Sequence, residues 1–544
     1  MTAQPSLAGV RIDDWFLTAA ERGNPATRLD ARRGGVAWSA GNEVRPLTHG
    51  AAYFAELLAR VPALRAGDLL LFTDWRGDHD ERLTAAGPRI ADLFCAAARR
   101  GVLVRGLLWR SHLDRFQFSE QENRQLGEEV EAAGGECVLD MRVRPGGSHH
   151  MKMIVLRHAG RPADDVAFVG GIDLCHSRRD DACHAGDPQR QPMAAVYGTS
   201  PPWHDVQAMI QGPAVGDVEA VFRERWEDPA PPTRNPARRL RDLLAGVEDA
   251  RRLPPQLPDP PSRGTHAVQL LRTYPYRRRG YAFAPNGERS IARGYLKALP
   301  RARSLIYLED QYLWNAGVVA ALARALRDQP ELRLIAVIPR FPDQDGRLSM
   351  PPNLVGRIDA LAALRRAGGD RVAVYSPENQ AGTPVYVHAK VCVVDDTWAI
   401  VGSDNFNRRS WTHDSELSCA VIDQPAGRAG TVRMSRSGPA GDGVRRGAGT
   451  YAHALRTALS REHLGGAGAE VDSACGGFEA FRRAAARLDA WHADGRRGPR
   501  PPGRLRSYRS PVLPAWTTAW ARLPYRLIYD PDGRPPAMRR AGRF

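Results

Sequence analysis

The chain has 544 residues, which is too long for one simple domain. Hydrophobic residues make up 43%, enough for a sizeable core, and this excludes a globally disordered protein. Lys and Arg total 77 against 61 Asp and Glu, a net charge of +16. That excess fits either a solvated, Arg-rich surface or attraction to a polyanion, and charge alone does not choose between an anionic membrane and nucleic acid.

The seven cysteines are widely spaced and include no CxxC pair, so we expect no disulfide framework and a reducing compartment. Cys175-His176 and Cys183-His184 do not match the spacing of a common zinc site, and we expect neither a metal nor another cofactor. We see no signal peptide and no run of about 18 apolar residues. The expected location is the cytoplasm, or the inner membrane surface through peripheral contact.

Taken in chain order, the predicted elements occur twice. Short apolar runs predict buried strands, and longer runs with helical spacing predict helices between them. The first set consists of strands at 69–72, 102–104 and 137–139, with a helix at 90–99. The second set consists of strands at 305–308, 332–335 and 372–374, with a helix at 318–327. The offset between the sets is almost constant, which indicates two copies of one α/β unit.

Each copy is followed by the same short motif. His150-Met-Lys152 follows the first set and His388-Ala-Lys390 follows the second. After each motif come an apolar strand, a turn, and a second strand that ends in glycine: 153–156 and 166–169 in the first copy, 391–394 and 398–401 in the second. The repeat therefore extends through a pair of strands beyond each His-x-Lys motif.

These patterns predict an α/β fold, a pseudo-two-fold duplication with two mixed sheets flanked by helices and the active site at their interface. Residues 1–230 are expected to form the N-terminal lobe and 265–475 the C-terminal lobe. Residues 231–264 are a Pro-rich connection, and 476–544 a basic, Pro- and Arg-rich extension. A loop rich in Gly, Arg and Ser is expected at 425–449.

The paired motifs suit phosphoryl transfer without a metal. Residues at i and i+2 of an extended segment point to the same side, so each His and Lys can face one cleft. Two imidazoles can then divide the work of nucleophile and general acid/base. The two ammonium groups can offset charge that develops on the phosphoryl oxygens, and the amide of Asn405 can donate a hydrogen bond to the same atoms.

A specific resemblance supports this interpretation. The run from His388 through Lys390 to Asp395, followed by Gly402-Ser403-Asp404-Asn405, resembles the HxKxxxxD…GSxN signature of the phospholipase D superfamily. Other segments are similar to those of the phospholipases D proper: 203–206, 212–215, 225–226, 306–312 and 461–465. The resemblance spans roughly Gly67 to Gly465.

The resemblance implies roles for individual residues. His150 corresponds to the nucleophile and His388 to the acid/base. Asp205 and Glu416 correspond to the acids that orient the imidazoles, and which acid serves which histidine stays open. Asp395 completes the set of expected site residues, although its place past the strand suggests that it braces the turn.

Two positions of the first copy depart from the family pattern. Arg157 stands where the second copy has Asp395, and Asp173 stands where it has Asn405. We expect the loss of a bracing acid to leave catalysis possible and Arg157→Asp to change activity only mildly. Asp164 or Asp165 is a candidate for the same bracing role.

The expected function is hydrolysis of a glycerophospholipid to phosphatidate and a free head group through a phosphohistidine, with transphosphatidylation when an alcohol replaces water. A cardiolipin-synthase-like phosphatidyltransferase and a nuclease on the same fold remain alternatives. A non-catalytic scaffold that binds lipid or nucleic acid is the third. The expected partners are a phospholipid substrate and an anionic membrane surface, with nucleic acid as the less favoured partner, and no oligomer is required. Head-group preference is not readable from the sequence.

Overall fold

The structure is a computed structural model that describes residues 11–544 except 112–119, 234, 245–249, 425–449 and 467. The loop expected at 425–449 therefore lies outside the described residues. The predicted strands and helices of both copies are confirmed, most of them within one or two residues of their expected limits.

Seven strands form the first half of a large sheet. In spatial order they are β4 (Glu136–Asp140), β3 (Leu103–Trp109), β2 (Leu69–Asp74), β5 (Met153–Arg157), β6 (Val166–Gly170), β8 (Val206–Gln211) and β1 (Ser39–Thr48). β2, β3 and β4 are parallel, and the remaining pairings are antiparallel. The mixture of directions is the one that the sequence predicted.

The second half repeats this order strand for strand. It contains β13 (Val372–Pro377), β12 (Arg333–Val337), β11 (Leu305–Glu309), β15 (Val391–Val394), β16 (Trp398–Gly402), β17 (Glu416–Asp423) and β9 (His266–Tyr274). β11, β12 and β13 are parallel, like their counterparts. The duplicated α/β fold is thus confirmed by matching topology. Two short strands lie outside the repeat, β18 (Leu505–Ser507) beside β13 and β10 (Glu288–Arg289) beside β9.

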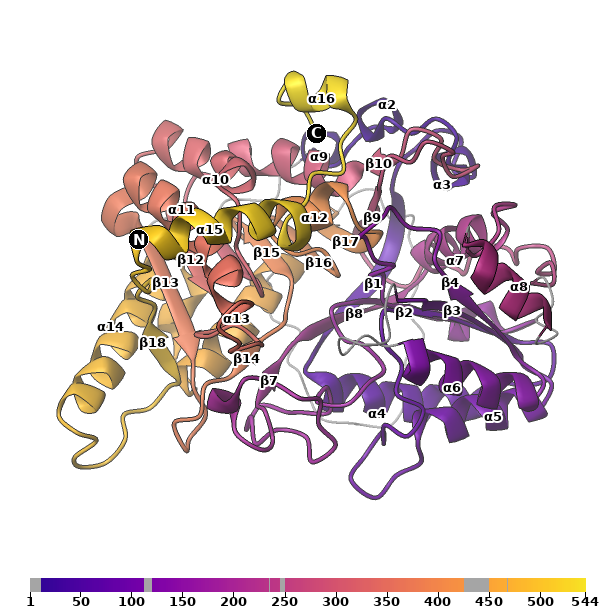
Figure 1. Cartoon of the computed structure of the whole chain (residues 1–544), viewed down its shortest axis with the longest axis horizontal. Helices are drawn as coiled ribbons and strands as arrows, with labels where there is room; N and C mark the ends of the chain where they lie inside the picture. Colours follow the sequence, from indigo (N-terminus) through magenta and orange to yellow (C-terminus); the bar gives the residue numbers. More distant parts are fainter. Residues whose placement is uncertain (1–10, 112–119, 234, 245–249, 425–449, 467) are drawn as a thin grey trace.

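The two halves are joined edge to edge. β1 and β9 pair antiparallel, with Asn42 opposite His266, so the two predicted sheets form one continuous 16-stranded sheet (Figure 1). A second, small sheet crosses between the halves, where β7 (Trp203–His204) pairs in parallel with β14 (Tyr386–Val387). This small sheet lies beside the second His-x-Lys motif in the chain.

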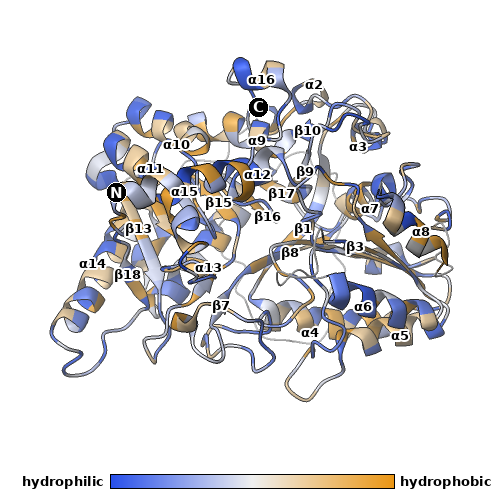
Figure 2. Ribbon diagram, viewed as in Figure 1, coloured by the Kyte–Doolittle hydropathy of each residue, from blue (hydrophilic) through white to orange (hydrophobic). Residues whose placement is uncertain are grey.

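Helices cover both faces of the large sheet and bury its apolar side chains. One face of the first half packs against α4 (Gly50–Arg60), α5 (Ile90–Arg99) and α6 (Glu120–Ala132). The same face of the second half packs against α9 (Ser290–Ala298), α10 (Ala316–Asp328) and α11 (Met350–Gly368). On the opposite face one core runs under both halves, covered by α7 (Ala214–Trp226), α13 (Tyr451–Leu464) and α14 (Ala474–Ala493). Figure 2 shows hydrophobic colours along central strands such as β8 and β15.

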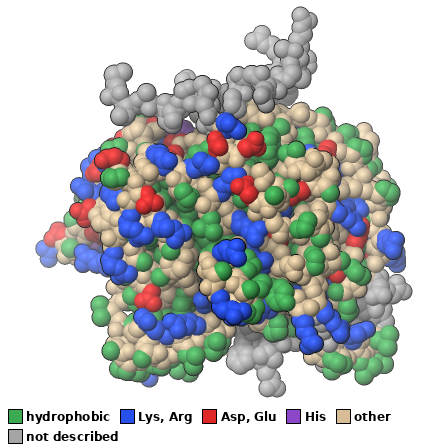
Figure 3. Space-filling view, turned by 90° about the horizontal axis from the view of Figure 1, so that it is seen from above, with side chains coloured by type: hydrophobic (Ala, Val, Ile, Leu, Met, Phe, Trp, Pro, Cys, Tyr) green, Lys and Arg blue, Asp and Glu red, His purple; other side chains and the backbone are tan. Residues whose placement is uncertain are grey.

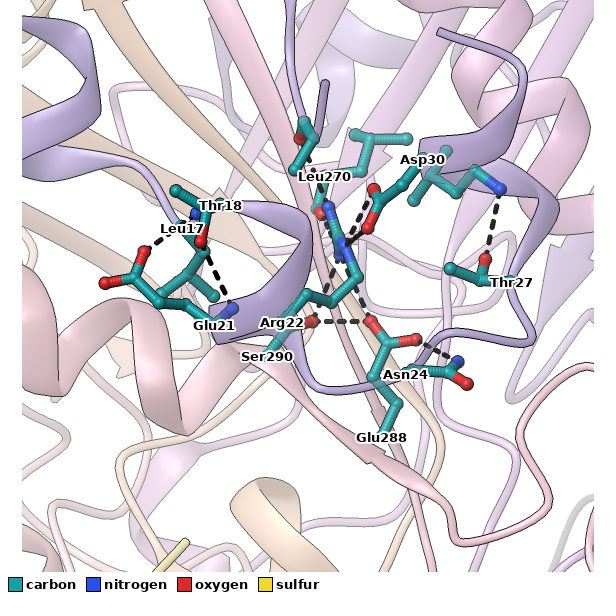
Figure 4. Close-up of polar contacts among 12 residues, drawn as sticks. Leu17, Thr18, Glu21, Arg22, Asn24, Thr27, Asp30, Leu270, Glu288 and Ser290 are labelled. Atoms are coloured by element: carbon teal, nitrogen blue, oxygen red, sulfur yellow. Dashed lines mark hydrogen bonds and ion pairs between the residues drawn. The ribbon is translucent and has the colours of Figure 1, made fainter. Parts of the chain in front are cut away.

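The N-terminal segment is anchored across the junction of the two halves. Buried Arg22, at the end of α2 (Ala19–Arg22), pairs with Asp30 at 2.9 Å and with Glu288 of β10 at 3.1 Å (Figure 4). The guanidinium also donates to the backbone oxygen of Leu270 in β9. Residues that the sequence assigned to the N-terminal lobe therefore contact the second half of the sheet.

The C-terminal segment is more ordered than its composition suggested. Within the region expected to be an extension, β18 continues the sheet, and α15 (Ala515–Pro524) and a π-helix (Tyr525–Tyr529) pack beside α11. In the part of the chain that the structure describes, no helix is both long and apolar enough to span a bilayer. The lobe boundaries themselves stay a prediction.

Candidate active site

Both His-x-Lys motifs lie in extended segments immediately before a strand, His150 before β5 and His388 before β15. Each segment is fixed by the other half of the molecule. The His150 N–H donates to the Ser415 oxygen at 2.9 Å, and the His388 N–H donates to the His204 oxygen at 2.7 Å. The duplication therefore presents the two motifs to each other with equivalent backbone support.

Each imidazole contacts a carboxylate that comes from the opposite half. His150 Nδ1 lies 2.8 Å from Glu416 Oε2, at the start of β17. His388 Nδ1 lies 2.6 Å from Asp205 Oδ2, just before β8. The structure thus answers which acid is paired with which histidine, and both Nε2 atoms are left for other partners. Ser403 supports the first pair by donating to Glu416 at 2.6 Å.

The two lysines are almost fully buried beside their histidines. Lys152 donates to the His150 backbone oxygen at 2.9 Å and pairs with Asp173 at 3.3 Å. Lys390 donates to the His388 backbone oxygen and reaches Gln311 Oε1 at 3.3 Å. Each ammonium is held by its own motif and by one side chain from elsewhere in the same half.

The electrostatic environment keeps both imidazoles neutral. Burial and the charges of Lys152 and Lys390 lower the pKa of His150 well below its ordinary value. Burial, Lys390 and Arg178 lower the pKa of His388 in the same way. Lys390 thus acts on the histidine of the other motif, and Lys152 acts on His388. The four groups therefore share one electrostatic site.

The other charged groups of the site are also shifted by burial. Burial and Asp414 raise the pKa of Glu416 well above its ordinary value, and burial raises that of Asp205. Burial lowers the pKa of Lys390 to about 8. Burial therefore disfavours the charged forms of both acids and of Lys390.

The comparisons with known proteins place this arrangement in a family. The family described as Phospholipase D matches residues 85–324 and 372–487, well over half of the chain. The chain belongs to the phospholipase D family. The family described as Cardiolipin synthase, PLD-like domain, matches residues 295–429.

The chain is similar to two plant proteins and to one solved structure. Phospholipase D alpha 1 of Cynara cardunculus is 26% identical over 61% of this chain and 51% of its own length. Phospholipase D alpha 1 of Oryza sativa subsp. japonica is 27% identical over 66% and 55%. The chain therefore spans about half the length of these relatives. A phosphatidylserine synthase of Haemophilus influenzae is 13% identical, with a TM-score of 0.48 over 74% of this chain and 87% of its own.

The aspartate of the HxKxxxxD motif lies away from the histidines. Asp395 follows β15, about 15 Å along the strand from Lys390. Its carboxylate accepts hydrogen bonds from the backbone N–H groups of Arg303, Ser304 and Leu305 at 2.6–2.9 Å. We expected Asp395 among the catalytic residues, and this position corrects that expectation, because the side chain braces the entry to β11.

In the first copy, the corresponding turn is braced by different residues. Arg157 is fully buried, pairs with Asp165 at 2.7 Å and with Glu219, and donates to the Pro258 oxygen. Asp165 also accepts from the His158 N–H at 2.6 Å, so it braces this turn, whereas Asp164 is exposed and pairs with Arg161. The first copy therefore braces its turn with Asp165, which belongs to a buried ion-pair network with Arg157 and Glu219.

The other departure lies within the site. Asp173 follows β6 as Asn405 follows β16. Burial and Asp173 raise the pKa of the neighbouring Asp74 well above its ordinary value. Burial alone would raise the pKa of Asp173, but the charges of Lys152 and Arg178 lower it. This pair of carboxyl groups holds one proton and one charge, and the charge lies against Lys152.

Asn405 is buried, and its side-chain oxygen has no hydrogen-bond partner among the described residues. It follows β16, whose last residue, Gly402, donates to the Lys390 oxygen at 3.2 Å. The structure therefore places Asn405 at the same end of the sheet as Lys390.

Sequence reasoning missed several side chains of the site. Trp75 lies edge-on to His150, with ring centroids 6.3 Å apart, and Trp203 lies 5.0 Å from His388. Arg178 stacks on Trp203 at 3.9 Å. Trp75 and Gln311 occupy equivalent places after β2 and β11, so the repeat itself was the signal that could have identified them.

Proposed function

We propose that this protein hydrolyses a glycerophospholipid to phosphatidate and a free head group through a phosphohistidine intermediate. The observation that carries the proposal is the crossed pairing of His150 with Glu416 and of His388 with Asp205, with both lysines acting on both imidazoles. Such a site has two imidazoles in equivalent settings and a cationic field for a phosphodiester.

In the first step, the Nε2 lone pair of His150 forms a bond to phosphorus while the bond from phosphorus to the head-group oxygen breaks. Nε2 of His388 gives a proton to that oxygen, so the head group leaves as a neutral alcohol. The ammonium groups of Lys152 and Lys390 and the amide of Asn405 stabilise the charge on the non-bridging oxygens. The product is a phosphatidyl group on His150.

In the second step, His388 takes a proton from water while the water oxygen bonds to phosphorus and the bond to His150 breaks. Phosphatidate leaves and both histidines return to their starting state. An alcohol in the place of water gives transphosphatidylation by the same bonds. This second outcome gains support from the match to the cardiolipin synthase family over residues 295–429.

Substrate binding supplies the protonation state that the first step needs. Burial and nearby cations hold the pKa of His388 low in the free enzyme. A phosphodiester anion offsets the charges of Lys390 and Arg178, so it raises that pKa and favours the imidazolium that acts as the acid. His150 stays the neutral nucleophile, since only one proton is required.

A peripheral contact with an anionic bilayer fits the surface of the C-terminal helices. Four large apolar side chains are between 64% and 72% exposed there: Trp516, Leu523, Leu527 and Ile528. Arg522 and Arg526 are exposed among them, a mixture that suits an interfacial helix. Tyr525 of the same segment packs on Trp314, three residues beyond Gln311 of the site. Figure 3 shows a face on which Lys and Arg side chains are interspersed with hydrophobic ones.

The test is an assay with vesicles of phosphatidylcholine, phosphatidylethanolamine and phosphatidylglycerol in the presence of ethanol, beside single-stranded DNA. Phosphatidylethanol formation, together with phosphatidate, would support phospholipid chemistry through a covalent intermediate. Cleaved DNA without a lipid product would refute the proposal in favour of a nuclease. Vesicle sedimentation of the wild type and of Leu527→Glu/Ile528→Glu tests the membrane contact, and equal binding by both would exclude this surface.

A further inference from the structure

A buried cluster of three histidines and a glutamate lies next to the backbone of His388. His49 precedes α4, His184 lies in the loop after β6, His204 lies in β7 and Glu462 lies near the end of α13. Their candidate ligand atoms all lie within 4.8 Å of one another. The histidine side chains are at most 3% exposed and that of Glu462 is 12% exposed.

The three ring nitrogens lie about as far from the Glu462 carboxylate oxygens as two ligands of one zinc ion lie from each other. His49 Nε2, His184 Nε2 and His204 Nδ1 lie 2.8, 3.1 and 3.4 Å from the Glu462 carboxylate. Around a zinc ion with bonds of 2.0–2.1 Å, ligand atoms lie about 3.3 Å apart. The three rings surround the carboxylate, with centroids 4.7, 5.0 and 5.6 Å apart.

The hydrogen bonds of two rings fix where their protons lie. His184 Nδ1 is 3.0 Å from the Trp203 backbone oxygen, which only accepts, so Nδ1 carries the hydrogen. His204 Nε2 is 2.7 Å from Glu309, a carboxylate that accepts, so Nε2 carries the hydrogen there. Each ring then turns its other nitrogen toward Glu462. His204 Nδ1 is fully buried and has no hydrogen-bond partner in the described structure.

The ring nitrogens that face Glu462 and the carboxylate itself are all groups that can bind a cation. The rings of His184 and His204 have centroids 5.6 Å apart, and Arg504 lies 3.7 Å from Glu462. One divalent cation meets all three rings and the carboxylate at once. Glu309 supplies the outer contact typical of a metal-bound imidazole, since it fixes His204 through the nitrogen that faces away from Glu462.

We propose that His49, His184, His204 and Glu462 bind one zinc ion in a closed structural site. Imidazole and carboxylate donors in a four-coordinate arrangement favour zinc over magnesium or calcium. All four positions are taken by the protein, so the ion has no place for substrate and takes no part in bond making. The proposal departs from the sequence, in which no zinc spacing is evident.

An ion at this site would fix the positions of two residues of the candidate active site. The His204 backbone oxygen accepts hydrogen bonds from the N–H groups of His388 and Ala389 at 2.7 and 3.1 Å. The His49 N–H donates to the Asp205 oxygen at 2.8 Å. An ion bound to His49 and His204 therefore holds the backbone of both members of the His388–Asp205 pair. This consequence rests on the proposed function, whereas metal binding itself does not.

The test is the metal content of the untagged full-length chain, purified without chelator and dialysed against zinc. We expect close to one tightly bound zinc per chain by mass spectrometry. In Glu462→Gln and in His184→Ala binding should weaken by at least about tenfold. The control His158→Ala removes a buried histidine outside the cluster and should keep the zinc. Cobalt in place of zinc should give the intense visible absorption of a tetrahedral site.

Two results would overturn the site: a wild-type chain that retains no divalent metal after dialysis, or equal zinc in the wild type, Glu462→Gln and the control. Glu462→Gln is nearly isosteric, so it decides the matter if His184→Ala does not fold, as judged by circular dichroism. Lipid turnover is measured separately. Bound zinc without turnover would refute the proposed function alone, and turnover without zinc would refute the metal site alone.

Discussion

The two half-sites have the same backbone arrangement but differ in the charges around it. In the first, Lys152 pairs with the carboxylate of Asp173. In the second, the side chain that Lys390 contacts is the uncharged amide of Gln311, and Asn405 stands in the place of Asp173. The first half-site therefore partly neutralises its ammonium, whereas the second keeps it available.

Exposure differs as well. The His150 side chain is 15% exposed and that of His388 is 7% exposed. A more accessible imidazole suits attack on phosphorus, and a more enclosed imidazole suits proton transfer to a leaving oxygen. The two half-sites thus share one backbone geometry, while the residues around His150 and His388 differ and favour a different role for each histidine.

The largest expected effect comes from removing either imidazole. His150→Ala and His388→Ala should each lower kcat by at least about 10³-fold while folding is unchanged, because each ring serves a different bond-making or proton-transfer step. Phosphatidylethanol release measures the loss. His158→Ala is the matched control. Substantial turnover in either single variant would contradict a mechanism with two histidines.

The next effect separates the two orienting acids. Asp205→Asn and Glu416→Gln should each lower kcat by about 10²-fold, since an amide no longer stabilises the imidazolium or fixes its tautomer. We expect Asp205→Asn to move the pH profile of kcat more than Glu416→Gln does, because Asp205 contacts the ring that takes up the proton. Identical profiles would mean that the two histidines exchange roles.

Lys390 should set a basic limit to activity. Burial lowers its pKa to about 8, so the ammonium is charged below that pH and loses its proton as pH rises through it. We expect kcat/KM to fall by about tenfold above pH 8 as this charge is lost. In Lys390→Arg the guanidinium stays charged, so the fall should move to higher pH. A fall at the same pH in that variant would assign it to another group.

The smallest effect on chemistry should come from Arg157 and Asp395, which affect the fold instead. Because Arg157 is fully buried between Asp165 and Glu219, Arg157→Asp would place a third buried carboxyl group beside these two acids and remove the guanidinium that pairs with both. The expected change in activity stays mild, and we expect in addition a loss of about 3–5 kcal/mol in the free energy of unfolding.

Asp395→Asn keeps one side-chain oxygen for the backbone N–H groups of residues 303–305 and should cost only about 1–2 kcal/mol. Denaturant unfolding of both variants measures the difference. An equal loss in the free energy of unfolding for Arg157→Asp and Asp395→Asn would show that both turns are braced to the same extent.

The sequence by itself determined the duplicated α/β fold and identified the candidate catalytic residues. Apolar runs such as 69–72 and 305–308 mark buried strands, since only a strand with both faces covered tolerates them. The repeated His-x-Lys motif identified His150 and His388, because chemistry constrains residue type and spacing locally. The candidate acids Asp205 and Glu416 also came from their places in the motifs.

Only the tertiary structure decided how these residues meet. The pairing of His150 with Glu416 joins residues 266 positions apart, and no local pattern encodes such a contact. The continuity of the sheet through β1 and β9 likewise depends on which strand edges come together, and so does the segment that Asp395 braces. The cluster around Glu462 escaped the sequence for the same reason: its ligands come from four separate segments, which only the packing of both halves brings within reach.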